Sequence, residues 1–198
     1  MPFLSFLLFV LVSSFTPGPN NFMAMSFANK YGFKKTIKFS LGVSAGFFVL
    51  ALMCSIFNLL LISILPIIKL PLTILGVGYI LYLAYKTLTS KSIHNNNNEK
   101  NDETNKNLFL IGVLIQFINP KGILYGITVV STFILPYYTS YFSYFIFSLF
   151  LGIIGFLSSL CWSIFGSIFQ KSLSKYQKPF NIIMALLLIY SAISIVLH

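Results

Sequence analysis

The stretch Ser13–Met25, SSFTPGPNNFMAM, interrupts an apolar run that is otherwise long enough to cross a membrane. Pro17 and Pro19 remove two backbone N–H donors from the middle of this run, and a proline ring clashes with the carbonyl one turn earlier in a helix. In hydrocarbon, the carbonyls freed in this way must be buried in protein or must face a water-filled cavity. The sequence therefore predicts an apolar helix that is broken near its middle.

The composition is that of an integral membrane protein. Of 198 residues, 57% are hydrophobic and only 8% are charged, whereas soluble domains carry roughly 25% charged residues. The net charge of +10 does not indicate nucleic-acid binding, because the lysines lie in short segments between apolar runs rather than on one face. We expect the lipid bilayer, and no nucleic acid, to be a partner of this chain.

Six apolar runs are each long enough to span a bilayer, which takes about 20 residues. They lie at about 3–28, 39–62, 65–87, 108–134, 141–169 and 180–197. Eleven of the thirteen lysines fall in the first, third and fifth connections, and lysine-rich short loops face the cytoplasm. The sequence predicts an all-α, multi-pass protein of the cell (inner) membrane with six transmembrane helices and both termini outside the cytoplasm.

A polar, Asn-rich segment at 88–107 separates two three-helix repeats, 1–87 and 108–198, and contains all three acidic residues of the chain. Because three is odd, equivalent repeats must enter the membrane from opposite sides, as in an inverted repeat. The motif TPGPNN in the first span matches INPKG in the fourth, and glycine pairs recur in the second and fifth spans, at Gly42 and Gly46 and at Gly152 and Gly155. We interpret these four glycines as helix-packing positions, which leaves close packing within the chain or a homodimer open.

Matching proline-interrupted helices are the best sequence indication of a transporter's substrate site. The predicted substrate-binding residues come from the two interruptions: Pro17, Gly18, Pro19, Asn20 and Asn21, with Asn119, Pro120 and Lys121. Lys121 lies about 20 Å into the fourth span at 1.5 Å per residue, where a cation costs at least ~2.5–3.5 kcal/mol. No carboxylate of the chain lies in any apolar run, so we expect a substrate carboxylate to pair with Lys121 and a substrate ammonium to meet the freed carbonyls. A lysine that reaches a polar pocket for structural reasons is the alternative.

Catalytic residues, metal sites and cofactors are not expected. Cys54 and Cys161 both lie in apolar runs, where cysteine behaves as a small hydrophobic residue. His94 and His198 are isolated from other metal-ligating residues. The sequence thus indicates neither a disulfide framework nor a zinc site.

The motifs TPGPNN, GVSAG, GVGYILYLAYK and INPKGILYG resemble those of the LysE/RhtB family of amino-acid exporters, along nearly the whole chain. The second half, including CWSIFGSIFQKS, is particularly similar to the branch that exports cysteine and O-acetylserine. The resemblance implies proton-driven efflux of a small zwitterionic amino acid, as an antiporter. Many relatives carry an acidic residue in the fifth span, where this chain has Ser158 and Ser159, so the proton-coupling group is left open.

Two other function classes remain at this point. Related six-helix folds include transmembrane thiol–disulfide electron carriers, and Cys54 and Cys161 make such a carrier conceivable. A metal-efflux protein is the other class, although the chain has few residues that suit a metal.

Overall fold

The computed structural model describes residues 1–89, 107–168 and 177–197, and every element in these ranges is helical. In chain order the elements are α1 (Phe3–Phe15), α2 (Pro19–Tyr31), α3 (Phe33–Ile56), α4 (Asn58–Thr89), α5 (Leu108–Ile118), α6 (Pro120–Val129), the π-helical turn η1 (Val130–Ile134), α7 (Tyr141–Ile168) and α9 (Gln177–Leu197). Nearly all of the polar segment expected at 88–107 lies outside the described residues.

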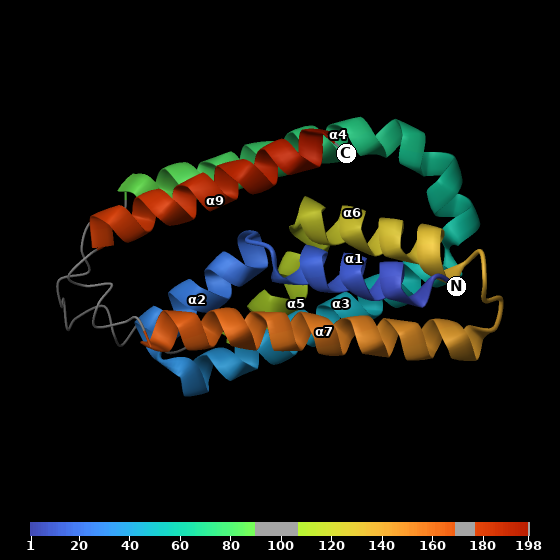
Figure 1. Ribbon diagram of the computed structural model, residues 1–198, viewed down its shortest axis with the longest axis horizontal. Coiled ribbons are helices and arrows are strands. Elements are labelled where there is room, and N and C mark those ends of the chain that lie inside the picture. The colour runs from blue at the N-terminus through green and yellow to red at the C-terminus, as the bar shows by residue number, and fades with distance from the viewer. Residues whose placement is uncertain (90–106, 169–176, 198) are drawn as a thin grey trace.

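The helices form a bundle in which the long pair α4 and α9 runs along one side and α7 runs along the other (Figure 1). α1 and α6 lie between these two sides, and α3 packs extensively against both α5 and α7. α2 lies against α7. The short helices α1, α2, α5 and α6 thus pack against longer helices, with one face of α1 and of α5 buried and the other exposed.

Two of the expected spans are broken helices. α1 and α2 meet at an angle of 48°, and α5 meets the helix that runs from Pro120 to Ile134 at 66°. The break at residues 16–18 agrees with the prediction from Pro17 and Pro19. Among the described residues, α3 and α7 are long and apolar enough to cross a membrane by themselves, and four spans result if each bent pair counts as one. The described residues thus establish an all-helical fold with helices long and apolar enough to span a membrane, and the count of six stays a prediction.

The connection between the second and third spans is misplaced by the sequence analysis. Hydropathy places it near residues 63–64, whereas α3 ends at Ile56 and α4 begins at Asn58 with only Phe57 between them. The sequence stays apolar through this turn, so hydropathy does not reveal it. Asn58 is the only polar residue directly at the turn. α3 also begins at Phe33 rather than near 39, because lysines are good helix formers and can extend an apolar helix into water.

At one end of the bundle the helices approach backbone to backbone through glycine. A Cβ atom on Gly42 of α3 would overlap the carbonyl oxygen of Phe109 in α5, and one on Gly112 of α5 would overlap that of Phe39. A Cβ on Gly46 would lie 2.7 Å from the carbonyl oxygen of Val113. Small residues are what allows such close contact between helices in a membrane. Gly42 and Gly46 are therefore used within the chain.

At the other end, large side chains hold the helices apart. Phe6 of α1 is buried among three other phenylalanines, with ring centroids 5.8 Å from Phe147, 5.9 Å from Phe133 and 5.9 Å from Phe150. This aromatic cluster joins α1, η1 and α7, and its core extends into α3 and α6. The bundle is thus closely packed around α2 and α5, and more widely spaced around α1 and α6.

We predict that Gly42→Ala lowers the thermal stability of the purified protein, because the added methyl group would force α3 and α5 apart. Overpacking of this kind costs about 1–3 kcal/mol. Gly78→Ala is the matched control, since a Cβ on Gly78 of α4 would meet nothing within 4 Å. Thermal unfolding in detergent, followed by circular dichroism, should show a lower midpoint for the first variant only. Equal midpoints for the two variants would contradict the close contact between α3 and α5.

Candidate functional site: a cavity between two broken helices

The two breaks meet in the interior of the bundle. Asn20, in the first turn of α2, donates through Nδ2 to Oε1 of Gln116 in α5 at 2.8 Å. Asn119, at the break between α5 and α6, donates through Nδ2 to Oδ1 of Asn20 at 3.0 Å. The structure therefore brings together the PGPNN and INPKG segments, as the sequence analysis predicts.

The first break leaves several carbonyls of α1 without amide donors. In an α-helix the carbonyl of residue i accepts from the N–H of residue i+4. For Ser13 that donor would be Pro17, and for Phe15 it would be Pro19, and neither proline has an N–H. Gly18 is extended, with φ of −171° and ψ of 175°, so its N–H does not continue the helix either. The last turn of α1 needs other donors, because unpaired buried carbonyls are costly.

Thr16, directly after α1, and side chains from two other helices supply these donors. The hydrogen bonds are from Thr16 Oγ1 to Ser13 O (3.0 Å), from Asn21 Nδ2 and Ser158 Oγ to Ser14 O (2.9 and 2.7 Å), and from Trp162 Nε1 to Phe15 O (3.2 Å). Asn21 belongs to α2, and Ser158 and Trp162 belong to α7. The break is thus a feature of the tertiary structure rather than a local kink, since some donors that satisfy its carbonyls come from residues far away in the chain.

Lys121, in the first turn of α6, donates hydrogen bonds to two further carbonyls at the break. Its Nζ donates to the carbonyl oxygens of Thr16 and Pro17, both at 3.0 Å, and to Oγ1 of Thr16 at 3.2 Å. A lysine ammonium has three N–H donors, and all three have an acceptor here. The carbonyls freed by Pro17 and Pro19, which the sequence analysis assigns to a substrate ammonium, instead accept from Thr16 and Trp162 in the structure. Lys121 occupies the two carbonyls that lie within the break, those of Thr16 and Pro17.

The amide side chains between the breaks form a chain with a fixed direction. Gln116 donates through Nε2 to the carbonyl oxygen of Gly112 at 3.1 Å, so its Oε1 must accept from Asn20. Asn20 then presents its own Oδ1 to Asn119, which must donate. This series of hydrogen bonds ends at Oδ1 of Asn119, which is buried and has no hydrogen-bond partner among the described residues.

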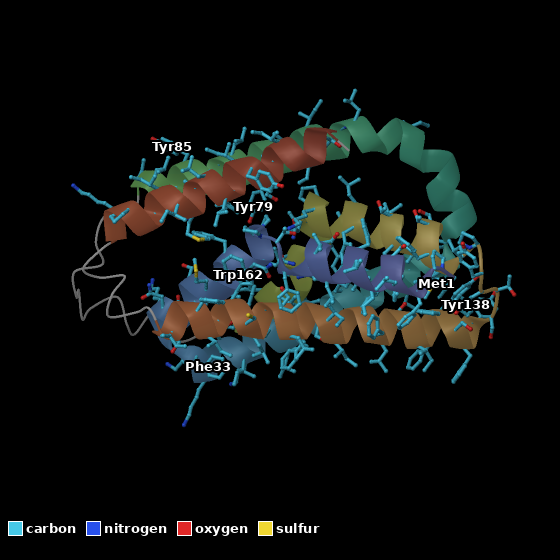
Figure 2. The ribbon with its side chains drawn as sticks, viewed as in Figure 1. Met1, Phe33, Tyr79, Tyr85, Tyr138 and Trp162 are labelled. Atoms are coloured by element: carbon cyan, nitrogen blue, oxygen red, sulfur yellow. The ribbon has the colours of Figure 1, made fainter. Side chains whose placement is uncertain are left out.

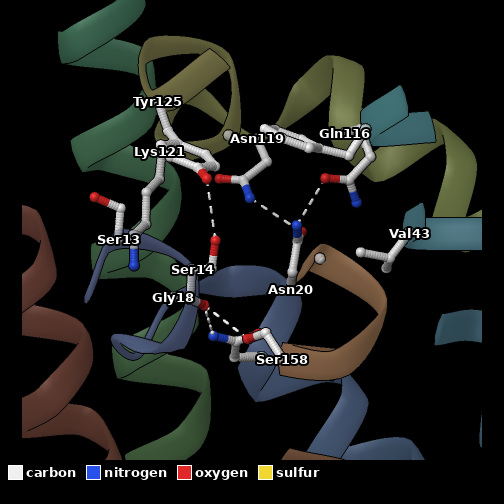
Figure 3. A pocket seen from close by; sticks show the side chains of 14 residues that line it. Ser13, Ser14, Gly18, Asn20, Val43, Gln116, Asn119, Lys121, Tyr125 and Ser158 are labelled. Carbon is white, nitrogen blue, oxygen red and sulfur yellow. Dashed lines mark hydrogen bonds between the residues drawn. The ribbon is translucent and has the colours of Figure 1, made fainter. Parts of the chain in front are cut away.

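A cavity of about 60 Å³ lies at this junction (Figure 3). Its lining includes Ser13, Ser14, Gly18, Asn20, Asn119 and Lys121. The volume is enough for a few water molecules. α2 and α6 both begin here, and neither has a side-chain cap on its N-terminus. Helix N-termini favour anions, so the cavity combines amide donors, carbonyl acceptors and one cation without any carboxylate.

Five of the eight predicted site residues line this cavity: Gly18, Asn20, Asn21, Asn119 and Lys121. Pro17 and Pro19 form the break itself. Pro120 instead packs on α4, where a Cβ on Gly76 would overlap its ring. Gly155, expected to pack between helices, lines the cavity as well, and a Cβ there would touch only Phe47 at 4.0 Å.

Five polar residues that line the cavity are not among the predicted substrate-binding residues: Ser13, Ser14, Gln116, Tyr125 and Ser158. Gln116 is the only polar residue of the apolar helix LFLIGVLIQFI, and this is a usable signal because polar groups in membrane helices are costly. Tyr125 stacks on Phe47 with ring centroids 5.2 Å apart, and its hydroxyl accepts from Ser14 Oγ at 3.2 Å. Its sequence context gives no such signal, because tyrosine is common in the chain.

Comparison with known proteins identifies the family. The family profile described as LysE type translocator matches residues 11–198. The chain belongs to the LysE-type translocator family. The "Cysteine/O-acetylserine efflux protein" of Salmonella typhimurium is 39% identical over 192 residues, which cover 96% of this chain and 95% of the relative. The protein of the same name from Escherichia coli O6:K15:H31 is 36% identical over the same length.

No solved structure matches this LysE-type translocator. The family membership confirms the resemblance drawn from TPGPNN and INPKG, and it indicates a multi-pass membrane transporter rather than an enzyme. The described residues contain no group of three histidine, cysteine or acidic side chains that could hold a metal ion.

We predict that Asn20→Leu and Gln116→Leu each destabilise the translocator by about 1–3 kcal/mol, because the first leaves the buried amides of Gln116 and Asn119 without Asn20 as a partner and the second leaves the partly buried amide of Asn20 without its acceptor. The double variant should lose less than the sum of the two, since it removes both partners of the 2.8 Å hydrogen bond. Thermal unfolding of the wild type, both single variants and the double variant measures this coupling, which for residues in contact is about 0.5–3 kcal/mol. Additive losses would show that the two amides do not interact.

Proposed function

We propose that this translocator exports cysteine and O-acetylserine, or amino acids of similar size, from the cytoplasm. The relatives that match nearly the full chain carry those substrates in their names. The observation that carries the proposal is the cavity itself, which lies where two broken helices from different halves of the chain meet and contains a lysine but no carboxylate. A zwitterion brings the carboxylate that the protein lacks there.

The cavity offers separate partners for the two charges of an amino acid. The uncapped N-termini of α2 and α6 present backbone N–H groups and a positive dipole end to a carboxylate. Carbonyls and amide oxygens, including the unpaired Oδ1 of Asn119, suit an ammonium. In this conformation Oδ1 of Asn119 is closed off from solvent, so it becomes available only when the site opens.

We further propose alternating access by two inverted repeats, 1–87 and 108–198. In this scheme the broken helix α1–α2 corresponds to the broken helix α5–α6. Helix α3 corresponds to α7, and α4 corresponds to α9. The packing supports the scheme, since the corresponding helices α3 and α7 contact each other extensively, as do α4 and α9. The glycine contacts close one end of the bundle around α2 and α5, while α1 and α6 are more widely spaced. Exchange of these two packing modes between the repeats would move the opening across the membrane.

The remaining parts of the proposal concern orientation, assembly and energy. Both termini face away from the cytoplasm, and a homodimer would use a face other than Gly42 and Gly46, which contact α5. Export is driven by proton antiport, as expected from the family resemblance. In α7, Ser158 lies on the break of α1 through its 2.7 Å hydrogen bond to Ser14 O, in the region where many relatives carry an acid.

The electron-carrier alternative is not favoured by the positions of the cysteines. α3 and α7 run antiparallel, since Ser40 bonds Ser159 at 2.8 Å and Phe48 contacts Phe145 with centroids 5.5 Å apart. Cys161 therefore lies near the level of Ser40, and Cys54 lies fourteen residues further along α3, about 20 Å away at 1.5 Å per residue. A disulfide requires Cα atoms within about 7 Å.

We predict that proteoliposomes containing only this chain release preloaded cysteine and O-acetylserine severalfold faster when the outside is made acidic. Lysine, tested in the same way, should leave more slowly, because its side chain would bring a second cation close to Lys121. Liposomes without protein are the control. No release of any of these compounds from demonstrably folded protein would contradict an exporter.

The double variant Cys54→Ser, Cys161→Ser should keep the transport rate within about twofold of the wild type, because conservative changes at sites away from the cavity have small effects. Neither cysteine lines the cavity. The rate of cysteine efflux from proteoliposomes measures this. Complete loss of efflux from a stable double variant would return the thiol chemistry to consideration.

A further inference from the structure

The contact between Lys121 and the end of α1 has the chemistry of a substrate contact. The carbonyls of Thr16 and Pro17 lie at the C-terminal end of a helix, where the dipole is negative and the amide donors of the next turn are missing. Any primary ammonium of suitable reach would be bound there. Lys121 and a free amino acid share this group, so the lysine fills the place in which an ammonium of the substrate would be held.

The lysine has room to leave this place. Lys121 is only partly buried and lines the cavity together with Gly18. A Cβ on Gly18 would lie 3.0 Å from Cδ and 3.2 Å from Nζ of Lys121, so the glycine keeps the path of the side chain clear. Figure 3 shows the lysine reaching from α6 down to the segment that holds Gly18.

A zwitterion can replace both sides of this contact at once. Its carboxylate can pair with the ammonium of Lys121. Its own ammonium can then donate hydrogen bonds to the carbonyls of Thr16 and Pro17, which the lysine releases. Every charge then has a partner of opposite sign or dipole. An amine without a carboxylate would instead add a second cation beside Lys121, which is unfavourable at close range. An acid without an ammonium would leave the Pro17 carbonyl unpaired, while the Thr16 carbonyl would keep only its hydrogen bond from Asn21 Nδ2.

On these grounds, and resting on the proposed function, we propose that Lys121 is a stand-in for the substrate ammonium. It occupies the α1 carbonyls when the site is empty, and it turns to the substrate carboxylate when a zwitterion enters between them. Lys121 then has a specificity-determining role, since it admits ligands that carry both charges and rejects simple amines. The same exchange releases the end of α1 from α6, which couples binding to a change at the break.

The test compares cysteine with cysteamine, which is cysteine without its carboxylate, in equilibrium binding to the full-length purified protein under reducing conditions. The wild type should bind cysteine and should bind cysteamine at least about tenfold more weakly. Lys121→Met frees the carbonyls, so its affinity for cysteine should fall and its affinity for cysteamine should rise above that of the wild type. Lys121→Gln is the matched control, because its amide can still donate to the carbonyls and should give the loss without the gain.

The gain of cysteamine binding is the deciding result, because a merely structural loss would not produce it. A folded Lys121→Met variant that binds no more cysteamine than the wild type would overturn the proposal, while binding of cysteine by the wild type would leave the exporter function standing. Failure of the wild type to bind cysteine would instead count against the proposed function.

A second variant decides the matter if Lys121→Met does not fold. Lys121→Ala also removes the ammonium from the carbonyls of Thr16 and Pro17 and leaves the Thr16 hydroxyl in place, so cysteine should bind more weakly and cysteamine about threefold more tightly than to the wild type. Unchanged or weaker binding of cysteamine by this variant would overturn the stand-in role.

Discussion

Backbone carbonyls that have lost their amide donors cannot remain unpaired in the interior of a membrane protein, and the end of α1 has several of them. Pro17 and Pro19 remove the donors for Ser13 and Phe15. The replacements come from α2, α6 and α7, in the form of an asparagine, a lysine, a serine and a tryptophan. The helices that supply them must therefore surround the break, and this requirement fixes much of the arrangement of the bundle.

Close approach of the backbones makes this arrangement possible. Gly42 and Gly112 allow α3 and α5 to touch, which places Gln116 and Asn119 within reach of Asn20. The buried side-chain polar groups of the two breaks then satisfy one another, except for Oδ1 of Asn119. A site built in this way is stable without a substrate, yet its hydrogen bonds are ones that a small zwitterion could exchange.

Some of this could be predicted because it follows from chemistry local in the sequence. Proline has no N–H, so the break near residue 17 is certain once the segment is helical, and a lone lysine in an apolar run must find polar partners. The turn at Phe57 could not be predicted, because its apolar surroundings give hydropathy no contrast. The partners of Lys121 were also beyond prediction, since the sequence does not say which distant carbonyls a four-carbon side chain can reach.

The sequence by itself determined that this is a helical membrane protein of the LysE type, with interrupted helices in both halves and a lysine in an apolar run that contains no acidic residue. Only the tertiary structure decided that the two interruptions meet around one cavity and that Lys121 is already bound to the end of α1. The physical reason is the distance along the sequence over which each property is determined. Missing donors and buried charge are properties of single residues, whereas the choice of replacement partner depends on how glycine and aromatic contacts space the helices.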